Sequence, residues 1–412
     1  MLSSRGRRTI ALGVLLYLVS WGFGTPELFP VAIGLVLAPT LAWLWVRMIA
    51  RPMVLRRRTG HRELVEGGEI AVGLEVRPDG GPLPARARVV DKVGVLGAQV
   101  AEMAREGHAL RGGYLIPSAP RGRYTLSGAE VTIDDPFGLA ESRIPLERSD
   151  TVLVYPRVYQ LDGLFTDAGA AGGDEGRALL HRTAGYDLHS IRDFQAGESL
   201  RRVHWRSTAK RRKLMVKEMT ETPRDEAAVV LDCDATSVAG AVGSSSFDAQ
   251  VRAAASLLAR MVDSGHRCSL VMHGARRVRL RIQVGGAEWS TVLASLAAVR
   301  ADADRPLETM LREVVSASGA ADAVDAARVF VVTGVMSGPL AERLIALRSA
   351  RRDVAVVWVE APSYAGVQTV PGPATGASLR LARAGIPVAI LRAGDSVSEA
   401  LSARHLQAAS HA

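Results

Sequence analysis

Few of the residues that usually build a catalytic or cross-linked protein are present in this sequence. Its two cysteines, Cys233 and Cys268, both lie inside apolar runs, where a cysteine most often acts as a small buried hydrophobe. Nothing therefore requires disulfides or an oxidising compartment. Aromatic residues make up only 5% of the chain, yet apolar residues reach 48%, which excludes a disordered protein. No serine or cysteine nucleophile with an ordered set of partners is visible, and no glycine-rich phosphate loop, so we predict no enzymatic activity.

The excess of positive charge is concentrated near the amino terminus. The chain of 412 residues carries a formal net charge of +9. Arginines precede the first apolar run and follow the second; they are Arg5, Arg7, Arg8, Arg47, Arg51, Arg56, Arg57 and Arg58. Basic residues beside apolar helices set membrane topology and contact anionic lipid. This placement indicates that the basic residues contact the lipid bilayer rather than nucleic acid.

Two apolar runs, 9–23 and 29–50, flank a short turn that contains Glu27 and no basic residue. The second run is long enough to cross a bilayer as a helix, and the first reaches that length if the turn completes it. We predict membrane helices at about 9–28 and 29–50, within a region 1–58 that has basic flanks. A secretory signal peptide is the alternative, but the small-residue cleavage site is missing. The positive-inside rule then predicts a multi-pass protein of the inner (cytoplasmic) membrane, with the bulk of the chain in the cytoplasm.

Residues 59–158 show the pattern of short β-strands. In 69–76, apolar residues alternate with polar or small ones, which is the period of a half-buried strand. Further short runs are separated by Gly, Pro and Asp, and 134–139 has the composition of a tight turn. We predict a small β-sandwich that serves as a spacer or docking module.

Residues 225–412 alternate strand and helix patterns. Nearly all-apolar runs are typical of parallel strands covered on both faces, whereas 277–284 alternates with arginine and predicts an antiparallel edge strand. The expected strands are 227–233, 267–273, 277–284, 328–333, 353–360 and 388–391, and the expected helices are 247–264, 289–301, 307–316, 339–350 and 397–407. The fold class predicted for this segment is a doubly wound α/β domain, with its ligand site at the carboxyl ends of the central strands.

The first of these strands ends in acidic residues. Asp232, Asp234 and Thr236 place oxygen side chains two residues apart, and such groups can converge on Mg²⁺. Alternatively, the two aspartates cap the following loop or helix. A complete metal site would need another carboxylate or hydroxyl, and the strand expected at 328–333 ends without an acid. We therefore keep open a weakly bound Mg²⁺ and predict no certain cofactor.

Residues 159–224 join the two parts and contain a dense run of charged residues around one tryptophan. Apolar residues at regular intervals among the charges predict an ordered segment rather than a solvated linker. The run closely resembles the signature of a bacterial family known as domain of unknown function fifty-eight. The residues that carry the resemblance include Arg192, Asp193, Gly197, Glu198, Arg201, His204, Trp205 and Lys210. The strand-rich segment and the paired amino-terminal helices also fit this family.

The resemblance implies a von Willebrand factor A-like fold for the α/β domain. In that fold the first strand ends in an Asp-x-Ser-x-Ser metal-adhesion motif, whose positions match Asp232, Asp234 and Thr236 here, with Asp in place of the first Ser. Members of the family are often encoded beside MoxR-type AAA+ ATPases. The resemblance therefore implies an adaptor role beside such an ATPase.

Three roles remain open for the signature residues. A network of arginine and carboxylate side chains with Trp205 as its apolar pin could clamp the two parts together. The same residues could be hot spots for a protein partner. Catalysis by His204 beside Asp193 or Glu198 is the weakest role, because a lone histidine is a weak signal. We predict a membrane-anchored, non-enzymatic scaffold or adaptor, and the alternative is a metal-dependent hydrolase or nucleic-acid-processing protein that uses Asp232 and Asp234.

Overall fold

The structure, a computed structural model, describes most of the chain. The described residues are 1–60, 63–80, 82–84, 86–166, 184–193, 208–209, 213–223, 225–316, 326–367 and 373–402. They fall into two compact units, Met1–Tyr155 and Pro156–Ala412. Each unit is described by itself below.

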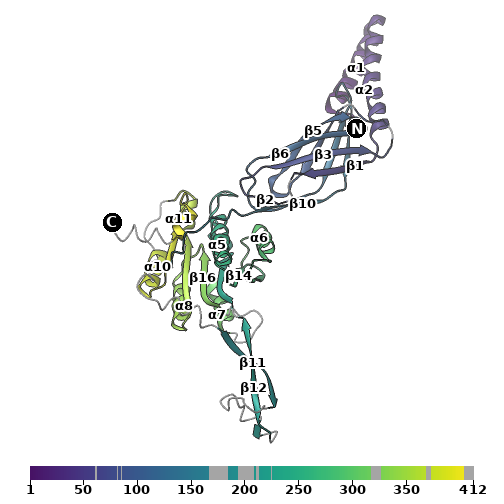
Figure 1. Cartoon of the computed structure of the whole chain (residues 1–412). Coiled ribbons are helices and arrows are strands. Elements are labelled where there is room, and N and C mark those ends of the chain that lie inside the picture. The colour runs from purple at the N-terminus through teal and green to yellow at the C-terminus, as the bar shows by residue number, and fades with distance from the viewer. Residues whose placement is uncertain are drawn as a thin grey trace. The chain divides into compact units, whose positions relative to one another are not determined.

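The first unit begins with two helices, α1 (Ser4–Phe23) and α2 (Phe29–Ile49), joined by a short turn (Figure 1). The helix α1 starts at Ser4 because the Ser3 hydroxyl accepts a hydrogen bond from the Gly6 backbone, and it ends at Gly24, which adopts a left-handed conformation. The two helices approach closely at Gly13, where a Cβ atom would lie 2.9 Å from the Leu35 side chain. Only the segment Pro26–Ile49 is long and apolar enough to cross a membrane among the helices of the described residues.

The rest of the first unit is β-rich, as the alternating patterns predicted. A seven-stranded sheet has the order β1-β3-β6-β5-β4-β8-β9, and a three-stranded sheet has the order β2-β10-β7. The strands are β1 (Met53–Thr59), β2 (Glu63–Val65), β3 (Ile70–Pro78), β4 (Arg86–Lys92), β5 (Ala98–Glu106), β6 (Ala109–Ile116), β7 (Gly122–Leu126), β8 (Ala129–Asp134), β9 (Glu141–Leu146) and β10 (Asp150–Tyr155). Apolar residues of both sheets form one buried cluster, which Ile49 at the end of α2 joins.

Three of the arginines that we assigned to a helix flank lie in strand β1 instead. Arg56 and Arg58 are exposed, but the side chain of Arg57 is fully buried. Its guanidinium donates hydrogen bonds from Nε and Nη2 to the two carboxylate oxygens of Asp91, at 2.9 and 2.8 Å. Tyr114 donates a further hydrogen bond to Asp91. Arg57 therefore holds the interior of the β-rich region together and does not serve a membrane flank.

The second unit contains the doubly wound α/β domain, whose six-stranded sheet has the order β15-β14-β13-β16-β17-β18. Its strands are β13 (Asp225–Asp232), β14 (Cys268–His273), β15 (Arg277–Ile282), β16 (Ala326–Thr333), β17 (Asp353–Val359) and β18 (Val388–Leu391). All neighbours pair in parallel except β15, which is antiparallel and lies at the edge, as its alternating pattern predicted.

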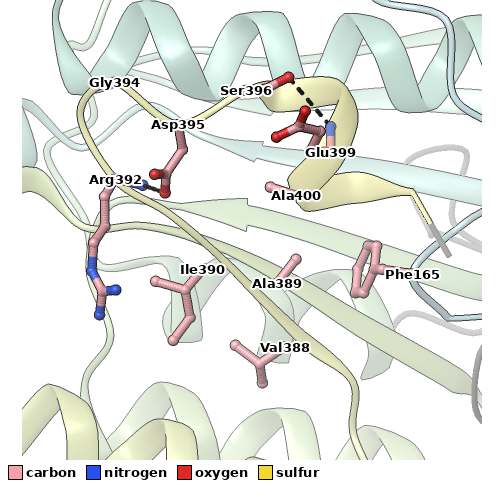
Figure 2. Close-up of a pocket in the computed structure, with 10 residues that line it drawn as sticks. All are labelled: Phe165, Val388, Ala389, Ile390, Arg392, Gly394, Asp395, Ser396, Glu399 and Ala400. Atoms are coloured by element: carbon pink, nitrogen blue, oxygen red, sulfur yellow. Dashed lines mark hydrogen bonds between the residues drawn. The ribbon is translucent and has the colours of Figure 1, made fainter. Parts of the chain in front are cut away.

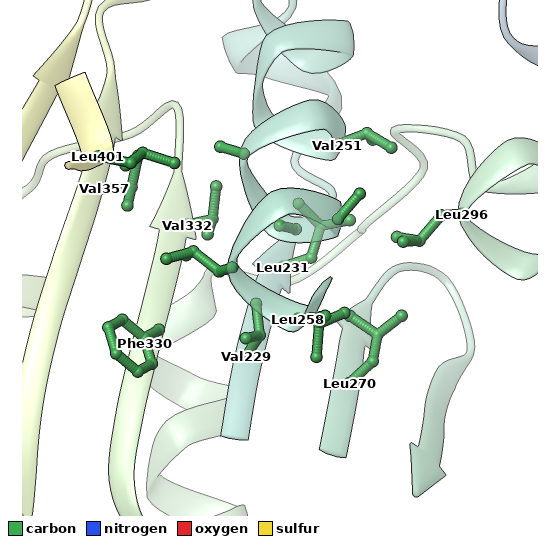
Figure 3. Close-up of a cluster of buried hydrophobic side chains, with 14 of the residues drawn as sticks. Val229, Leu231, Val251, Leu258, Leu270, Leu296, Phe330, Val332, Val357 and Leu401 are labelled. Carbon is green, nitrogen blue, oxygen red and sulfur yellow. The ribbon is translucent and has the colours of Figure 1, made fainter. Parts of the chain in front are cut away.

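Helices cover both faces of this sheet (Figure 1). The main ones are α5 (Ser246–Asp263), α6 (Trp289–Ala298), α7 (Leu307–Ser316), α8 (Gly338–Ser349), α10 (Pro373–Arg383) and α11 (Val397–Leu401), with a short α9 at Ala361–Tyr364. Because successive strand residues point to opposite faces, Val229 and Leu231 pack with α5 (Figure 3), whereas Ala228 and Val230 pack with α7 and α8. Burial on both faces explains the continuous apolar runs in the central strands.

Strands β11 (Ala184–Asp193) and β12 (Met215–Pro223) pair as an antiparallel hairpin ahead of this sheet. The pairing contains an irregularity between Leu188 and Ser190. Met215, at the start of β12, is buried and its backbone N–H donates a hydrogen bond to the Thr208 hydroxyl. The hairpin connects directly to β13, because β12 ends at Pro223 and β13 begins at Asp225.

Candidate functional site

The candidate site lies where β13 and β16 end side by side. From β13 the chain continues to β14 on one side, and from β16 it continues to β17 on the other. This is the topological switch point of the sheet, where a crevice opens outside the carboxyl ends of the strands in doubly wound folds. Asp232 is the last residue of β13 and Thr333 is the last of β16.

Asp232 is a buried carboxylic acid, with only 2% of its surface exposed. The Thr333 hydroxyl lies 2.7 Å from its Oδ2 atom, while Oδ1 is buried and has no hydrogen-bond partner among the described residues. Burial, together with the nearby charge of Asp234, raises the pKa of Asp232 to about 6; the Thr333 hydrogen bond and His273 oppose this shift. A backbone hydrogen bond with Asp234 also lowers this pKa, so the carboxyl group is partly satisfied while burial still raises its pKa.

Asp234 and Thr236 form a turn rather than an open set of ligands. The Asp234 Oδ1 atom accepts hydrogen bonds from the backbone N–H and from the hydroxyl of Thr236, both at 2.7 Å. Asp234 thereby caps the short 3-10 helix Ala235–Ser237. The sequence left open that the aspartates cap the following loop or helix, and Asp234 does cap the turn that follows it. The helix α5 is capped by Ser245 and Asp248 instead.

Two residues of this edge were missed by the sequence analysis. Gln250 on α5 is fully buried, and neither its side-chain oxygen nor its nitrogen has a hydrogen-bond partner among the described residues. Gly334 follows Thr333, and a Cβ atom there would lie 2.7 Å from both the Gln250 Nε2 atom and the Ser237 hydroxyl. Only glycine fits this close approach. A glutamine among the alanines of an apolar helix was the signal that could have identified Gln250.

The fit of these residues to a divalent cation is partial. The unpartnered Oδ1 of Asp232 is an oxygen ligand of the kind that Mg²⁺ prefers. The Thr333 hydroxyl contacts the other oxygen of Asp232, whereas the Thr236 hydroxyl contacts Asp234. However, within the described residues no group of three or more histidine, cysteine or carboxylate side chains is arranged to hold a metal ion. Asp232, Asp234 and Thr236 would hold such an ion together with water molecules.

A pocket of about 480 Å³ lies elsewhere on this domain, beside β18 and α11 (Figure 2). Phe165, Ile390 and Ala400 contribute apolar surface. Arg392 and Asp395 form its polar rim, where the Arg392 backbone donates to the Asp395 carboxylate at 2.8 Å. The Arg392 guanidinium instead pairs with Glu360, where Nε lies 2.7 Å from the carboxylate, and Ser396 and Glu399 complete the polar lining.

The signature residues lie largely outside the described residues. Arg192 and Asp193 end strand β11, opposite Val216 and Met215 of β12. The others, Gly197, Glu198, Arg201, His204, Trp205 and Lys210, are not among the described residues. Their roles stay predictions.

Comparison with known proteins confirms the resemblance that the signature indicated. Residues 190–384 match a family model described as "Protein of unknown function DUF58". The match covers a little less than half of the chain, and over that part the chain is similar to the DUF58 family. The uncharacterized protein YeaD of Bacillus subtilis (strain 168) is 25% identical to this chain over 200 residues. That alignment covers 48% of each chain, so this chain spans about half the length of the curated relative.

Solved structures resemble the chain only weakly. The VWA domain of SpRpn10 aligns with a TM-score of 0.32 and 9% identity, covering 43% of this chain and 93% of that one. Cwp6 from Clostridium difficile aligns with a TM-score of 0.17 and 8% identity, covering 82% of this chain and 49% of that one.

Proposed function

We propose that this protein is a membrane-anchored, non-enzymatic scaffold or adaptor whose α/β domain binds a protein partner at the carboxyl edge of its sheet. The observation that carries the proposal is the switch-point edge itself, where Asp232 and Gln250 hold buried polar atoms that the described residues leave unsatisfied. A buried polar atom without a partner costs about 1–3 kcal/mol. Both side chains are enclosed, so a protein partner gains this free energy only if the turn Ala235–Ser237 opens as the partner binds.

The hydroxyl groups of this edge support binding rather than catalysis. The Thr236 hydroxyl donates to Asp234, the Ser245 hydroxyl lies 2.8 Å from Asp248, and the Ser237 hydroxyl donates to the Asp234 carbonyl. These contacts cap turns and helices. The nearby histidine, His273, lies 2.8 Å from the Arg305 carbonyl through Nε2, so its bond also goes to the backbone. A nucleophile activated by a histidine is not assembled among these residues.

A membrane anchor is supported by the surface of the two amino-terminal helices. In the candidate span Pro26–Ile49 only 22% of the most apolar window is buried, which is unlike the core helix of a soluble domain. Tryptophans lie near both ends of the helical pair, with Trp21 close to the turn and Trp43 and Trp45 close to the β-rich region. Tryptophan is enriched at both interfaces of a bilayer. We propose that α1 crosses beside α2, with both ends in the cytoplasm.

The partner that we propose is an AAA+ ATPase of the MoxR type, on the strength of the family resemblance. The test is chemical crosslinking and pull-down of the full-length protein from its own membranes. D232A with Q250A should lose the partner, whereas Asp263→Asn, an exposed change at the far end of α5, should retain it. Retention by D232A/Q250A and loss by R201A/W205A would move the contact to the signature residues. Loss by neither variant would refute a contact at this edge, and turnover of a substrate by the purified protein would refute a non-enzymatic role.

A second candidate function is favoured by the orphaned Asp232 oxygen together with Asp234. A bound divalent cation would supply Lewis-acid chemistry to a hydrolase or nucleic-acid-processing protein. Mg²⁺ or Mn²⁺ that binds the folded chain must stabilise it by mass action. Stabilisation of the native protein and not of D232N would support this candidate, and equal melting of the native protein with and without the cation would remove it.

A further inference from the structure

The turn between β8 and β9 is fastened to the start of α1. The Ser3 backbone N–H donates to the Leu139 carbonyl at 2.9 Å, and the Ser3 hydroxyl donates to the Gly138 carbonyl at 2.6 Å. At Gly6, a Cβ atom would lie 2.1 Å from the Leu139 carbonyl oxygen, so the helix and the turn are in direct contact. The carboxylate of Asp135 accepts hydrogen bonds from the Phe137 and Ala140 backbones, which fixes the shape of the turn.

Phe137 stands out from this turn with 78% of its surface exposed. Exposed arginines of α1 lie on the neighbouring helical turn; they are Arg5, Arg7 and Arg8, and the Arg5 Nη1 atom comes within 3.7 Å of a Cβ atom built on Gly138. The acidic residues beside the turn are paired, Asp134 with Arg88 at 3.5 Å and Glu141 with Arg143 at 3.2 Å. The exposed face is thus an aromatic ring beside three exposed arginines, while the Asp135 carboxylate of the turn is buried and bonded to the backbone.

The position of this face relative to a bilayer follows from its contact with α1. Gly6 contacts the turn, and the apolar stretch of α1 begins near Ile10. Four residues of helix rise by about 6 Å, which is within the thickness of a headgroup layer. Aromatic and basic side chains at that depth contact the lipid interface and anionic headgroups.

We propose that the turn Asp135–Ala140 is a second membrane contact, in which Phe137 enters the headgroup layer of an anionic bilayer while Arg5, Arg7 and Arg8 bind its phosphates. The contact would hold the β-rich region against the membrane surface. The inference rests on the membrane anchor proposed above, and the experiment below separates the failure of one from the failure of the other.

The chain offers matched positions for the test. Val95 is also 78% exposed, and the β4–β8 pairing places it at the opposite end of these strands from Phe137. Leu37 is 51% exposed near the middle of α2. Both native cysteines are fully buried, so F137C, V95C and L37C can each be labelled singly with an environment-sensitive fluorophore under native conditions.

The labelled full-length chains are reconstituted into nanodiscs of phosphatidylcholine, with and without phosphatidylglycerol, that contain lipids with a headgroup-level or a mid-chain quencher. We expect mid-chain quenching at 37, several-fold stronger headgroup-level quenching at 137 than at 95, and a further rise at 137 with phosphatidylglycerol that R5Q/R7Q/R8Q abolishes. Quenching at 37 but equal quenching at 137 and 95 would overturn this inference alone. Absence of quenching at 37 would overturn the anchor and the inference with it. Protection of the label at 137 in native membranes but not in nanodiscs would assign the turn to a protein partner and overturn the lipid contact.

Discussion

The raised pKa of Asp232 predicts that replacing its carboxylate with an amide stabilises the α/β domain near neutral pH. The folded chain holds the Asp232 proton more tightly than the unfolded chain, because burial disfavours the charged form. Charging this residue therefore costs stability, and the cost grows as the pH rises from about 4 to about 6. Asp232→Asn keeps the oxygen that faces Thr333 and removes the charge.

The magnitude can be worked from the pKa. A change from 3.8 to about 6 corresponds to about 3 kcal/mol of destabilisation when the carboxylate is fully charged. At about pH 5 roughly half of that cost is already present. The advantage of D232N should therefore be larger by about 1.5 kcal/mol at about pH 8 than at about pH 5, since the remaining charge is added in that interval. The new amide lacks an acceptor on its buried side, which costs about 1–3 kcal/mol, so we expect a net gain of about 0–2 kcal/mol at about pH 8.

The two cysteines provide a probe of this domain alone. Cys233 and Cys268 are fully buried at β13 and β14, and the first unit contains no cysteine. Thiol labelling with dithiodipyridine along a urea titration of the detergent-solubilised chain reports the unfolding of the α/β domain at both pH values. Asp263→Asn, an exposed change on the same domain, is the control and should show no pH-dependent gain.

Two results would refute the reasoning. A D232N chain with the same stability difference at both pH values would mean that Asp232 is solvated or titrates outside this interval. A D232N chain that is less stable than the native protein at about pH 8 would mean that the charge is compensated, as a bound cation would do.

Three further predictions concern the rest of the chain. Arg57→Met should destabilise the first unit by about 3–5 kcal/mol, because it leaves the buried Asp91 carboxylate with the Tyr114 hydroxyl but no cation. Arg56→Met, on the exposed face of the same strand, should change hydrogen-exchange protection little. Gly6→Ala should separate the β8–β9 turn from α1, because its Cβ atom would collide with Leu139. Gly22→Ala in the same helix meets no neighbour and should be tolerated. Hydrogen exchange at the Ser3 amide distinguishes the two variants, and equal exchange rates would contradict the contact. If the Trp205 ring is buried, Trp205→Ala should lower the free energy of unfolding by a few kcal/mol, about the effect of a large-to-small change in a core. An unchanged melting temperature together with lost binding of the partner would make Trp205 an interface residue.

Much of the α/β domain was predictable because burial on both sheet faces leaves a direct mark on the sequence. Strands β13, β16 and β17 are continuous apolar runs, and β15 was recognised as an antiparallel edge because arginine alternates with apolar residues. The helix α10 was missed because it begins Pro373-Ala-Thr-Gly, which has the composition of a loop. Its buried residues Ala377 and Leu381, one helical turn apart, show that packing on the sheet determined its structure.

The site was predictable only where neighbouring residues in the chain make the contacts. Asp234 and Thr236 meet within one turn, and their spacing suggested it. The contact of Asp232 with Thr333 spans 101 residues, and the contact of Arg57 with Asp91 spans 34. Local patterns carry no information on such pairs, which is why Arg57 was placed in a basic flank and Gln250 was not noticed.

Of the two candidate partner surfaces, only the one at Asp232 lies within the described residues. The β11–β12 hairpin, which leads into the signature residues, joins the beginning of β13, and Asp232 ends it. Eight residues of strand span about 25 Å, so Asp232 lies about that far from the beginning of β13. Substitutions at such distant sites usually contribute independently to stability and binding. If the partner binds at only one end, D232A/Q250A and R201A/W205A should differ sharply, and a combined variant should behave like the more damaging of the two. Additive losses from both would instead show that one partner reaches both ends of the strand or that two partners bind.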